Sequence, residues 1–183
     1  MVNPLELYDA ITLLPLERRK TLQLDSFPMN FSFWPETDIF LFACTSGNLY
    51  SYDFNKRILK KEQKLTEEFL PVATFINSYY YVFSTSSLKL CVGDLGEGSL
   101  FNLGSGNARI HFLQKLEKKH LLLSALTNGE MRIYRTDRLP RLLAICTIQH
   151  CQAGGVAAKV ENVMIGRKEF IITSSQMEGT VRV

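Results

Sequence analysis

The chain lacks a long apolar run. No stretch of about eighteen consecutive apolar residues occurs among its 183 residues, so the sequence predicts no membrane-spanning helix and no membrane partner. Residues 1–16 contain Glu6, Asp9 and two prolines in place of a positive segment followed by an apolar one. We therefore expect this segment not to be a secretory signal.

Cysteine is scarce and follows no recognisable pattern. The four cysteines, Cys44, Cys91, Cys146 and Cys151, are separated by 47, 55 and 5 residues. These spacings match neither a zinc site nor a disulfide framework. We therefore expect no metal and no cofactor, and a reducing, cytoplasmic location.

A strong excess of charge of one sign is also missing. The chain has 21 Lys and Arg against 18 Asp and Glu, which gives a net charge of +3 and a pI near 8.7. This excess is too small to indicate a nucleic-acid partner. The basic stretch from Lys56 to Lys64 is most simply a solvated outer strand whose lysines discourage edge-to-edge pairing.

The sequence does contain a repeat. An apolar run, a polar turn and an alternating run recur near 39–53, 79–92, 121–134 and 170–183. Residues that tolerate a hairpin turn connect the two runs, as in Asn128-Gly129. Counted from Gly47 to Ser87, Gly129 and Gly179, the steps are 40, 42 and 50 residues. A period of about 40 residues is typical of four-stranded propeller blades.

Each interval between hairpins contains the remaining strands of a blade. Candidate inner strands precede the hairpins at 29–34, 70–75, 108–113 and 156–163. Candidate outer strands follow the first three hairpins at 57–64, 99–103 and 141–148. The sequence thus predicts an all-β, WD-repeat-like β-propeller with about four blades present.

The predicted ring is incomplete or truncated, because WD-repeat propellers commonly have about seven blades and the fourth repeat stops after its third strand. Residues 21–183 form this partial propeller, and residues 1–20 form an N-terminal segment that we expect to act as a latch. Thr21–Leu24 and the preceding residues 17–20 could supply the outer strand of the last blade. Alternatively, part of a larger propeller is missing, or a second chain completes the ring.

One segment combines a thiol and an imidazole. Cys146, His150 and Cys151 lie together in the stretch that lengthens the last repeat. A base within hydrogen-bond reach activates a cysteine, but adjacent residues of an extended strand point to opposite faces. A structural hydrogen bond from His150 to the blade is the simpler interpretation. Asp53, Asp94 and Asp137 follow the alternating strands and are expected to close turns.

Several phrases resemble the diphthine methyl ester hydrolase family, which are WD-repeat proteins of the diphthamide pathway. The matching phrases are 22–25 with 33–35, Gly47-Asn-Leu-Tyr-Ser-Tyr-Asp-Phe-Asn55, Thr127-Asn-Gly-Glu130, Pro140-Arg-Leu142, His150 and Ala157-Ala158. The resemblance covers most of the chain from Thr21 onward. Asn30 and Phe33 stand where the family has acids, and no glutamate follows His150.

The resemblance implies a cytosolic enzyme that removes the methyl ester from methylated diphthine on translation elongation factor two. That activity would be carboxylic ester hydrolysis, and His150 is the matching position for a catalytic base. The alternative is a non-catalytic WD-repeat scaffold that binds protein partners in a complex, because no convergent group of titratable residues is visible. Whether the chain is an enzyme stays open at this point.

Overall fold

The computed structural model describes residues 3–5, 22–34, 37–68, 72–116, 120–151, 157–175 and 178–183. The regular elements in these ranges are 17 β-strands, all paired antiparallel, which confirms the prediction of an all-β fold. None of the described residues forms a helix with the length and apolarity needed to cross a bilayer.

Four sheets follow one another along the chain. The first sheet contains β3 (Pro28–Trp34), β4 (Ile39–Cys44), β5 (Asn48–Asp53) and β6 (Ile58–Lys64). The second contains β7 (Val72–Phe75), β8 (Tyr80–Ser84), β9 (Lys89–Asp94) and β10 (Leu100–Ser105). The third contains β11 (Ile110–Leu116), β12 (Leu121–Leu126), β13 (Glu130–Arg135) and β14 (Leu143–Gln149). The fourth contains β15 (Ala157–Ile165), β16 (Lys168–Ser175) and β17 (Thr180–Arg182).

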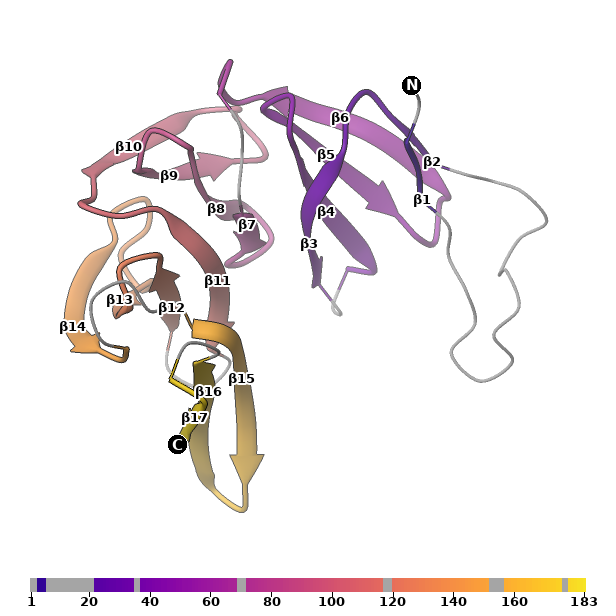
Figure 1. Ribbon diagram of the computed structural model, residues 1–183. Helices are drawn as coiled ribbons and strands as arrows, with labels where there is room; N and C mark the ends of the chain where they lie inside the picture. Colours follow the sequence, from indigo (N-terminus) through magenta and orange to yellow (C-terminus); the bar gives the residue numbers. More distant parts are fainter. Residues whose placement is uncertain are drawn as a thin grey trace.

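These sheets stand side by side in chain order along an open arc (Figure 1). The first strand of each sheet, β3, β7, β11 or β15, lies on the inner side of the arc, and β6, β10 and β14 lie on the outer side. The arc is open between the fourth sheet and the first. Within each sheet the strands pair in sequence order, so every connection is a short antiparallel one.

The hairpin turns correct one detail of the predicted repeat. The residue with positive φ in the second turn is Leu88 (φ 67°), not Ser87, and it takes the place of Gly47 (φ 78°) and Gly129 (φ 82°). Each of these three residues donates its N–H to the carbonyl three positions earlier. The step is therefore 41 residues from 47 to 88 and again 41 from 88 to 129. The first three sheets follow a more regular period than the sequence pattern indicated.

Apolar clusters fill the space between neighbouring sheets. The first cluster joins Leu41, Ala43 and Leu49 of the first sheet to the aromatic side chains of the second. The next joins the second sheet to the third through a cluster centred on Val82 and Leu122. The last joins the third sheet to Val160 of the fourth. Because each strand alternates its side chains between two faces, the second and third sheets are covered on both.

A two-stranded sheet precedes the arc. β1 (Asn3–Leu5) pairs antiparallel with β2 (Leu22–Leu24), and the Leu24 side chain packs on the first sheet beside Phe42 and Tyr50. The expectation that Thr21–Leu24 adds an outer strand to the last blade is therefore corrected for Leu22–Leu24, whose partner is β1. Residues 17–21 lie outside the described residues.

Candidate functional site

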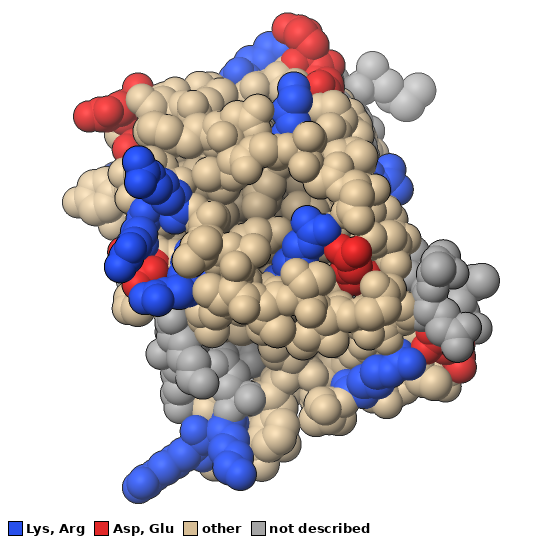
Figure 2. Space-filling model, turned by 90° about the vertical axis from the view of Figure 1, so that its left-hand side faces the viewer, with Lys and Arg blue, Asp and Glu red and all other residues tan. Residues whose placement is uncertain are grey.

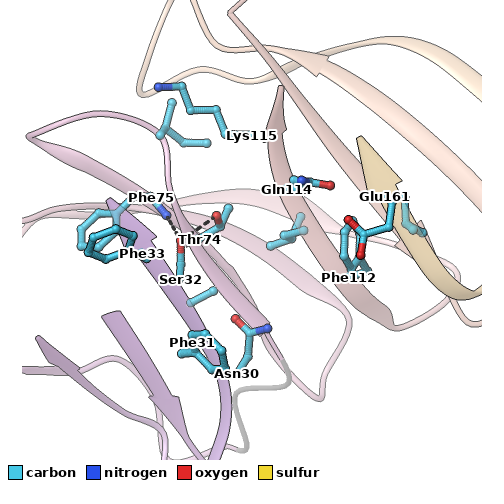
Figure 3. A pocket seen from close by; sticks show the side chains of 14 residues that line it. Asn30, Phe31, Ser32, Phe33, Thr74, Phe75, Phe112, Gln114, Lys115 and Glu161 are labelled. Atoms are coloured by element: carbon cyan, nitrogen blue, oxygen red, sulfur yellow. Dashed lines mark hydrogen bonds between the residues drawn. The ribbon is translucent and has the colours of Figure 1, made fainter. Parts of the chain in front are cut away.

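The inner strands of the four sheets surround a central hollow with a volume of about 920 Å³. We call this space the central hollow (Figure 3). Its walls come from β3, β7, β11 and β15, which are separated in the chain by some 40 residues each but meet on the inner side of the arc. The predicted inner strands included most of the lining residues but ended before Gln114 and Lys115, and the convergence of these strands depends on how the sheets pack.

Aromatic rings and small polar groups alternate along the wall. Phe31 and Phe33 from β3, Phe75 from β7 and Phe112 from β11 line the hollow (Figure 3). Between them, Ser32 Oγ lies 3.2 Å from Thr74 Oγ1 and accepts a hydrogen bond of 3.3 Å from the backbone N–H of Phe75. These bonds tie the inner strands of the first two sheets together. Phe31 and Phe33 are exposed, whereas Phe75 belongs to the buried cluster between the two sheets.

Charge in the described lining is sparse and balanced. Lys115 of β11 and Glu161 of β15 are the two charged residues among those that line the hollow. Gln114 contributes a buried amide oxygen without a hydrogen-bond partner among the described residues. A bound group with an N–H or O–H donor could satisfy this oxygen, because a buried acceptor without a partner costs free energy. The hollow is therefore suited to a ligand with apolar side chains and backbone-like polar groups.

His150 lies in the connection from β14 to β15, outside the residues that line the hollow. Its ring is buried, and Nδ1 is 3.1 Å from the Thr173 hydroxyl oxygen. Its backbone N–H donates to the Gly129 carbonyl at 2.9 Å. Nε2 is buried and has no hydrogen-bond partner among the described residues. The predicted base is thus engaged in the blade through one nitrogen, as the structural interpretation expected.

Burial lowers the pKa of His150 because the surroundings disfavour the charged imidazolium, and nearby Arg182 lowers it further. Glu178 acts in the opposite direction but less strongly. The imidazole is therefore neutral at pH 7. A neutral ring can accept a hydrogen bond from the Thr173 hydroxyl or donate one to it through Nδ1, depending on its tautomer, whereas an imidazolium can only donate.

This burial leads to a pH-dependence prediction. A histidine with a lowered pKa contributes stability above its unfolded value of about 6.5, and that stability is lost as the pH falls through the folded value. We expect the urea concentration at the midpoint of unfolding to decrease as the pH is lowered from 7.5 to 5.5. This decrease should be smaller in His150→Gln. His120→Gln, at an exposed position, is the control and should follow the parent protein. Equal pH dependence in all three proteins would contradict the prediction.

The structure does not pair His150 with the thiol of the adjacent Cys151. Cys151 is buried, Cys146 is exposed on β14, and none of the four cysteines, all of which lie in the described ranges, forms a disulfide. None of the hydrogen bonds made by described residues joins His150 to Cys151. No group of three or more metal-ligating side chains occurs within the described ranges.

The aspartates at or after the end of the second strand of each hairpin were predicted to close turns. Asp53 accepts a hydrogen bond from the Lys56 backbone N–H at 2.8 Å, and Asp94 accepts one from Gly96 at 2.7 Å. Asp137 pairs with Arg135. The turn-closing role predicted from the sequence is confirmed for Asp53 and Asp94.

Acidic partners accompany several of the described basic residues. Lys56 pairs with Asp53 at 2.9 Å and Lys64 with Glu67 at 2.5 Å, so the basic stretch of β6 is partly neutralised. On the face shown in Figure 2, the Lys and Arg side chains form separate small groups, and acidic side chains lie beside several of them.

Comparison with known proteins supports the fold. No protein-family model matches the chain, and no curated protein matches it. The crystal structure of the computationally designed Ika4 protein is similar, with a TM-score of 0.64, 15% identity and coverage of 87% of this chain and 91% of that one. The computationally designed Ika8 protein is similar with a TM-score of 0.67 and 14% identity, over 96% of this chain but 50% of the Ika8 chain. The shared feature is an arrangement of all-β sheets that unrelated sequences can adopt.

Proposed function

We propose that this chain is a WD-repeat-like propeller module that binds an extended segment of a partner protein in the central hollow. The observation that carries the proposal is the convergence of four inner strands on one space lined by aromatic rings. Aromatic side chains supply much contact area at protein interfaces. The regular step of 41 residues between the first three hairpins also supports a propeller of repeated blades.

The chemistry of the hollow favours binding over catalysis. Ester hydrolysis needs a nucleophile or activated water together with donors for the oxyanion. The titratable groups that line the hollow are Lys115 and Glu161 among the described residues, and His150 is buried elsewhere with Nδ1 already bonded. A scaffold needs none of these catalytic groups, only an accessible surface of stable shape.

The resemblance of the sequence to the diphthine methyl ester hydrolase family suggests translation elongation factor two as the first partner to test. We expect Phe31→Ala to weaken binding of that factor by about tenfold or more, because truncating an aromatic contact at an interface costs about 1–3 kcal/mol. Calorimetric titration would measure the change. Phe31 is 67% exposed, so the substitution should leave the fold intact.

Tyr79→Ala is the matched control. Tyr79 is an aromatic residue of similar exposure, 65%, and does not line the hollow. The variant should bind as the parent protein does. Equal losses in both variants would contradict binding in the hollow, and a failure of the parent protein to bind would contradict elongation factor two as the partner.

Hydrolysis of the methyl ester of diphthine is the second candidate. One observation favours it beyond the resemblance: Nε2 of His150 has no hydrogen-bond partner among the described residues, and in the tautomer whose Nδ1–H donates to Thr173 it carries the lone pair that a general base requires. Incubation with elongation factor two carrying methylated diphthine separates the two functions. Methanol release that His150→Gln abolishes supports the hydrolase, and binding without methanol release supports the scaffold.

A further inference from the structure

A second pocket lies between the second and third sheets, toward the outer side of the arc. Its volume is about 190 Å³, and its lining includes residues of β9, β10, β13 and β14. None of these residues lines the central hollow. Figure 2 looks onto this side of the molecule and shows a hollow in the surface with Lys and Arg side chains near it. We call this space the side pocket.

The wall of the side pocket is mostly apolar. Its buried part includes Leu90, Leu126 and Tyr134. Its half-buried part includes Leu88, Leu103 and Leu142. Such a wall favours a bulky apolar side chain, because burial of apolar surface is the main source of affinity in a pocket of this kind.

Arg132 is the one charged residue among those that line the side pocket. Its guanidinium donates to the Glu130 carboxylate at 2.6 Å and to the Asn107 side-chain oxygen at 2.9 Å. These two bonds hold the guanidinium in place, so the pocket has a fixed polar group in an otherwise apolar wall.

The repeat shows why there is space at this junction. Five positions before the turn residues Leu88 and Gly129 stand Phe83 in the second sheet and Ser124 in the third. Phe83 is buried in the junction with the first sheet, and its ring stacks on Tyr81 with centroids 5.9 Å apart. Ser124 lies opposite Arg132 and shares its face of the third sheet. The third sheet therefore presents a small side chain where the second presents a ring.

Packing and hydrogen bonding within the described residues give no reason for a serine at position 124. Ser124 is fully buried, and its Oγ has no hydrogen-bond partner among these residues. A buried hydroxyl without a partner costs free energy, whereas a ring would fill the junction. Ser124 does not itself line the side pocket, but Leu126 and Arg132 beside it do. We infer that the space itself is useful.

Leu88 is the second unusual residue of the side pocket. Its φ is +67°, and the equivalent turn residues of the first and third sheets are Gly47 and Gly129. A leucine is strained in this conformation and a glycine is not. Backbone strain of this kind is concentrated at binding and catalytic sites. The strained residue provides an apolar side chain at the half-buried part of the pocket, which a glycine would lack.

The surroundings of the side pocket are basic. The charged residues directly next to lining residues in the sequence are all positive and exposed, namely Lys89, Arg109, Arg135 and Arg141. Arg135 pairs with Asp137, and Lys89 lies near Glu68. Arg109 and Arg141 have no ion-pair partner among the described residues. Charge complementarity therefore favours an acidic partner.

We propose that the side pocket binds an acidic peptide segment of a partner protein through one bulky apolar side chain. That side chain takes the place that the Phe83 ring occupies at the neighbouring junction, and the acidic residues of the segment lie near Arg109 and Arg141. This is a second binding site, separate from the central hollow, and it does not depend on what the hollow binds.

Fluorescence anisotropy with the full chain is the test. The probe is a fluorescein-labelled synthetic peptide with one central leucine flanked by Asp and Glu. We expect saturable binding in the micromolar range that weakens as salt is added, because exposed charges are screened. Peptides with glycine in place of the leucine, or lysine in place of the acids, should each bind about tenfold more weakly or worse.

Leu88→Gly separates a binding role from a structural one. The variant restores the residue that the other two turns use, so its urea midpoint should be no lower than that of the parent protein. Its affinity for the acidic peptide should nevertheless fall about tenfold or more, because an apolar contact is lost. His120→Gly is the matched control: His120 also has a positive φ, 49°, but it is exposed and does not line the pocket. This variant should bind as the parent protein does.

A pair of charge reversals tests the basic surroundings. Arg109→Glu combined with Arg141→Glu should weaken binding about tenfold or more and reduce its salt dependence. Arg167→Glu combined with Lys168→Glu makes the same change of charge at exposed positions between β15 and β16. This control should retain the affinity of the parent protein.

Four results would overturn the proposal. The first is a parent protein that shows no saturation up to about 1 mM peptide. The second is equal affinity for the acidic peptide and its lysine counterpart. The third is an equal loss in Leu88→Gly and His120→Gly. The fourth is a loss of peptide binding in Phe31→Ala, which would place the peptide in the central hollow.

Discussion

Replacing Gly47 with alanine should lower the free energy of unfolding by about 3 kcal/mol, the largest effect expected of so small a change. Gly47 has a φ of +78°, where a side chain strains the backbone. A Cβ there would also lie 2.0 Å from the Thr66 carbonyl oxygen and 2.6 Å from that of Glu68. Both are backbone atoms of the segment after β6, so no side-chain rotation relieves the overlap.

Gly98→Ala is the control that separates backbone strain from crowding. Gly98 has a φ of +70°, but a Cβ added there would meet nothing within 4 Å apart from its chain neighbours. The substitution should cost about 1 kcal/mol, the strain alone. Urea unfolding followed by circular dichroism measures both variants, and equal losses would contradict the role of the close approach to Thr66.

Truncation of Phe75 to alanine should cost about 3–5 kcal/mol, because it opens a cavity between the first and second sheets. Phe75 is 5% exposed and belongs to the cluster with Tyr81 and Phe83. Phe33→Ala removes the ring at the equivalent position of the first sheet, where 43% of the residue is exposed. It should cost only about 1 kcal/mol, because less apolar surface is lost from burial.

Urea unfolding followed by circular dichroism measures the free energy of unfolding of both variants. Similar losses in the two variants would contradict the difference in burial between Phe75 and Phe33.

Local pattern was sufficient to predict most strands. The apolar and alternating runs placed β4, β5, β8, β9, β12 and β13, because these hairpins bury their side chains with a simple period. The turn at Leu88 was shifted by one residue, since Ser87 is the more usual turn residue and a leucine with positive φ has no sequence signal. Pairing of β1 with β2 was missed because Asn3–Leu5 is short and contains Pro4.

The candidate sites were less predictable than the strands. His150 stood out in the sequence, but its partner Thr173 is 23 residues away on another sheet. The central hollow has no sequence motif, because its lining takes a few residues from each of four inner strands. Which face of an inner strand meets the hollow depends on the packing of neighbouring sheets, and no local pattern records it.

The clusters between sheets join only consecutive sheets, and this determines how the molecule can come apart. A sheet with two covered faces has two neighbours to hold it. Among the described residues, the fourth sheet has one such neighbour, and the outer face of the first sheet is covered only by the smaller two-stranded sheet. Unravelling should therefore begin at the ends of the arc and move inward, so that the second and third sheets form the last cooperative unit to melt. In such a chain, the local stability of a sheet depends on its position along the arc as much as on its own residues.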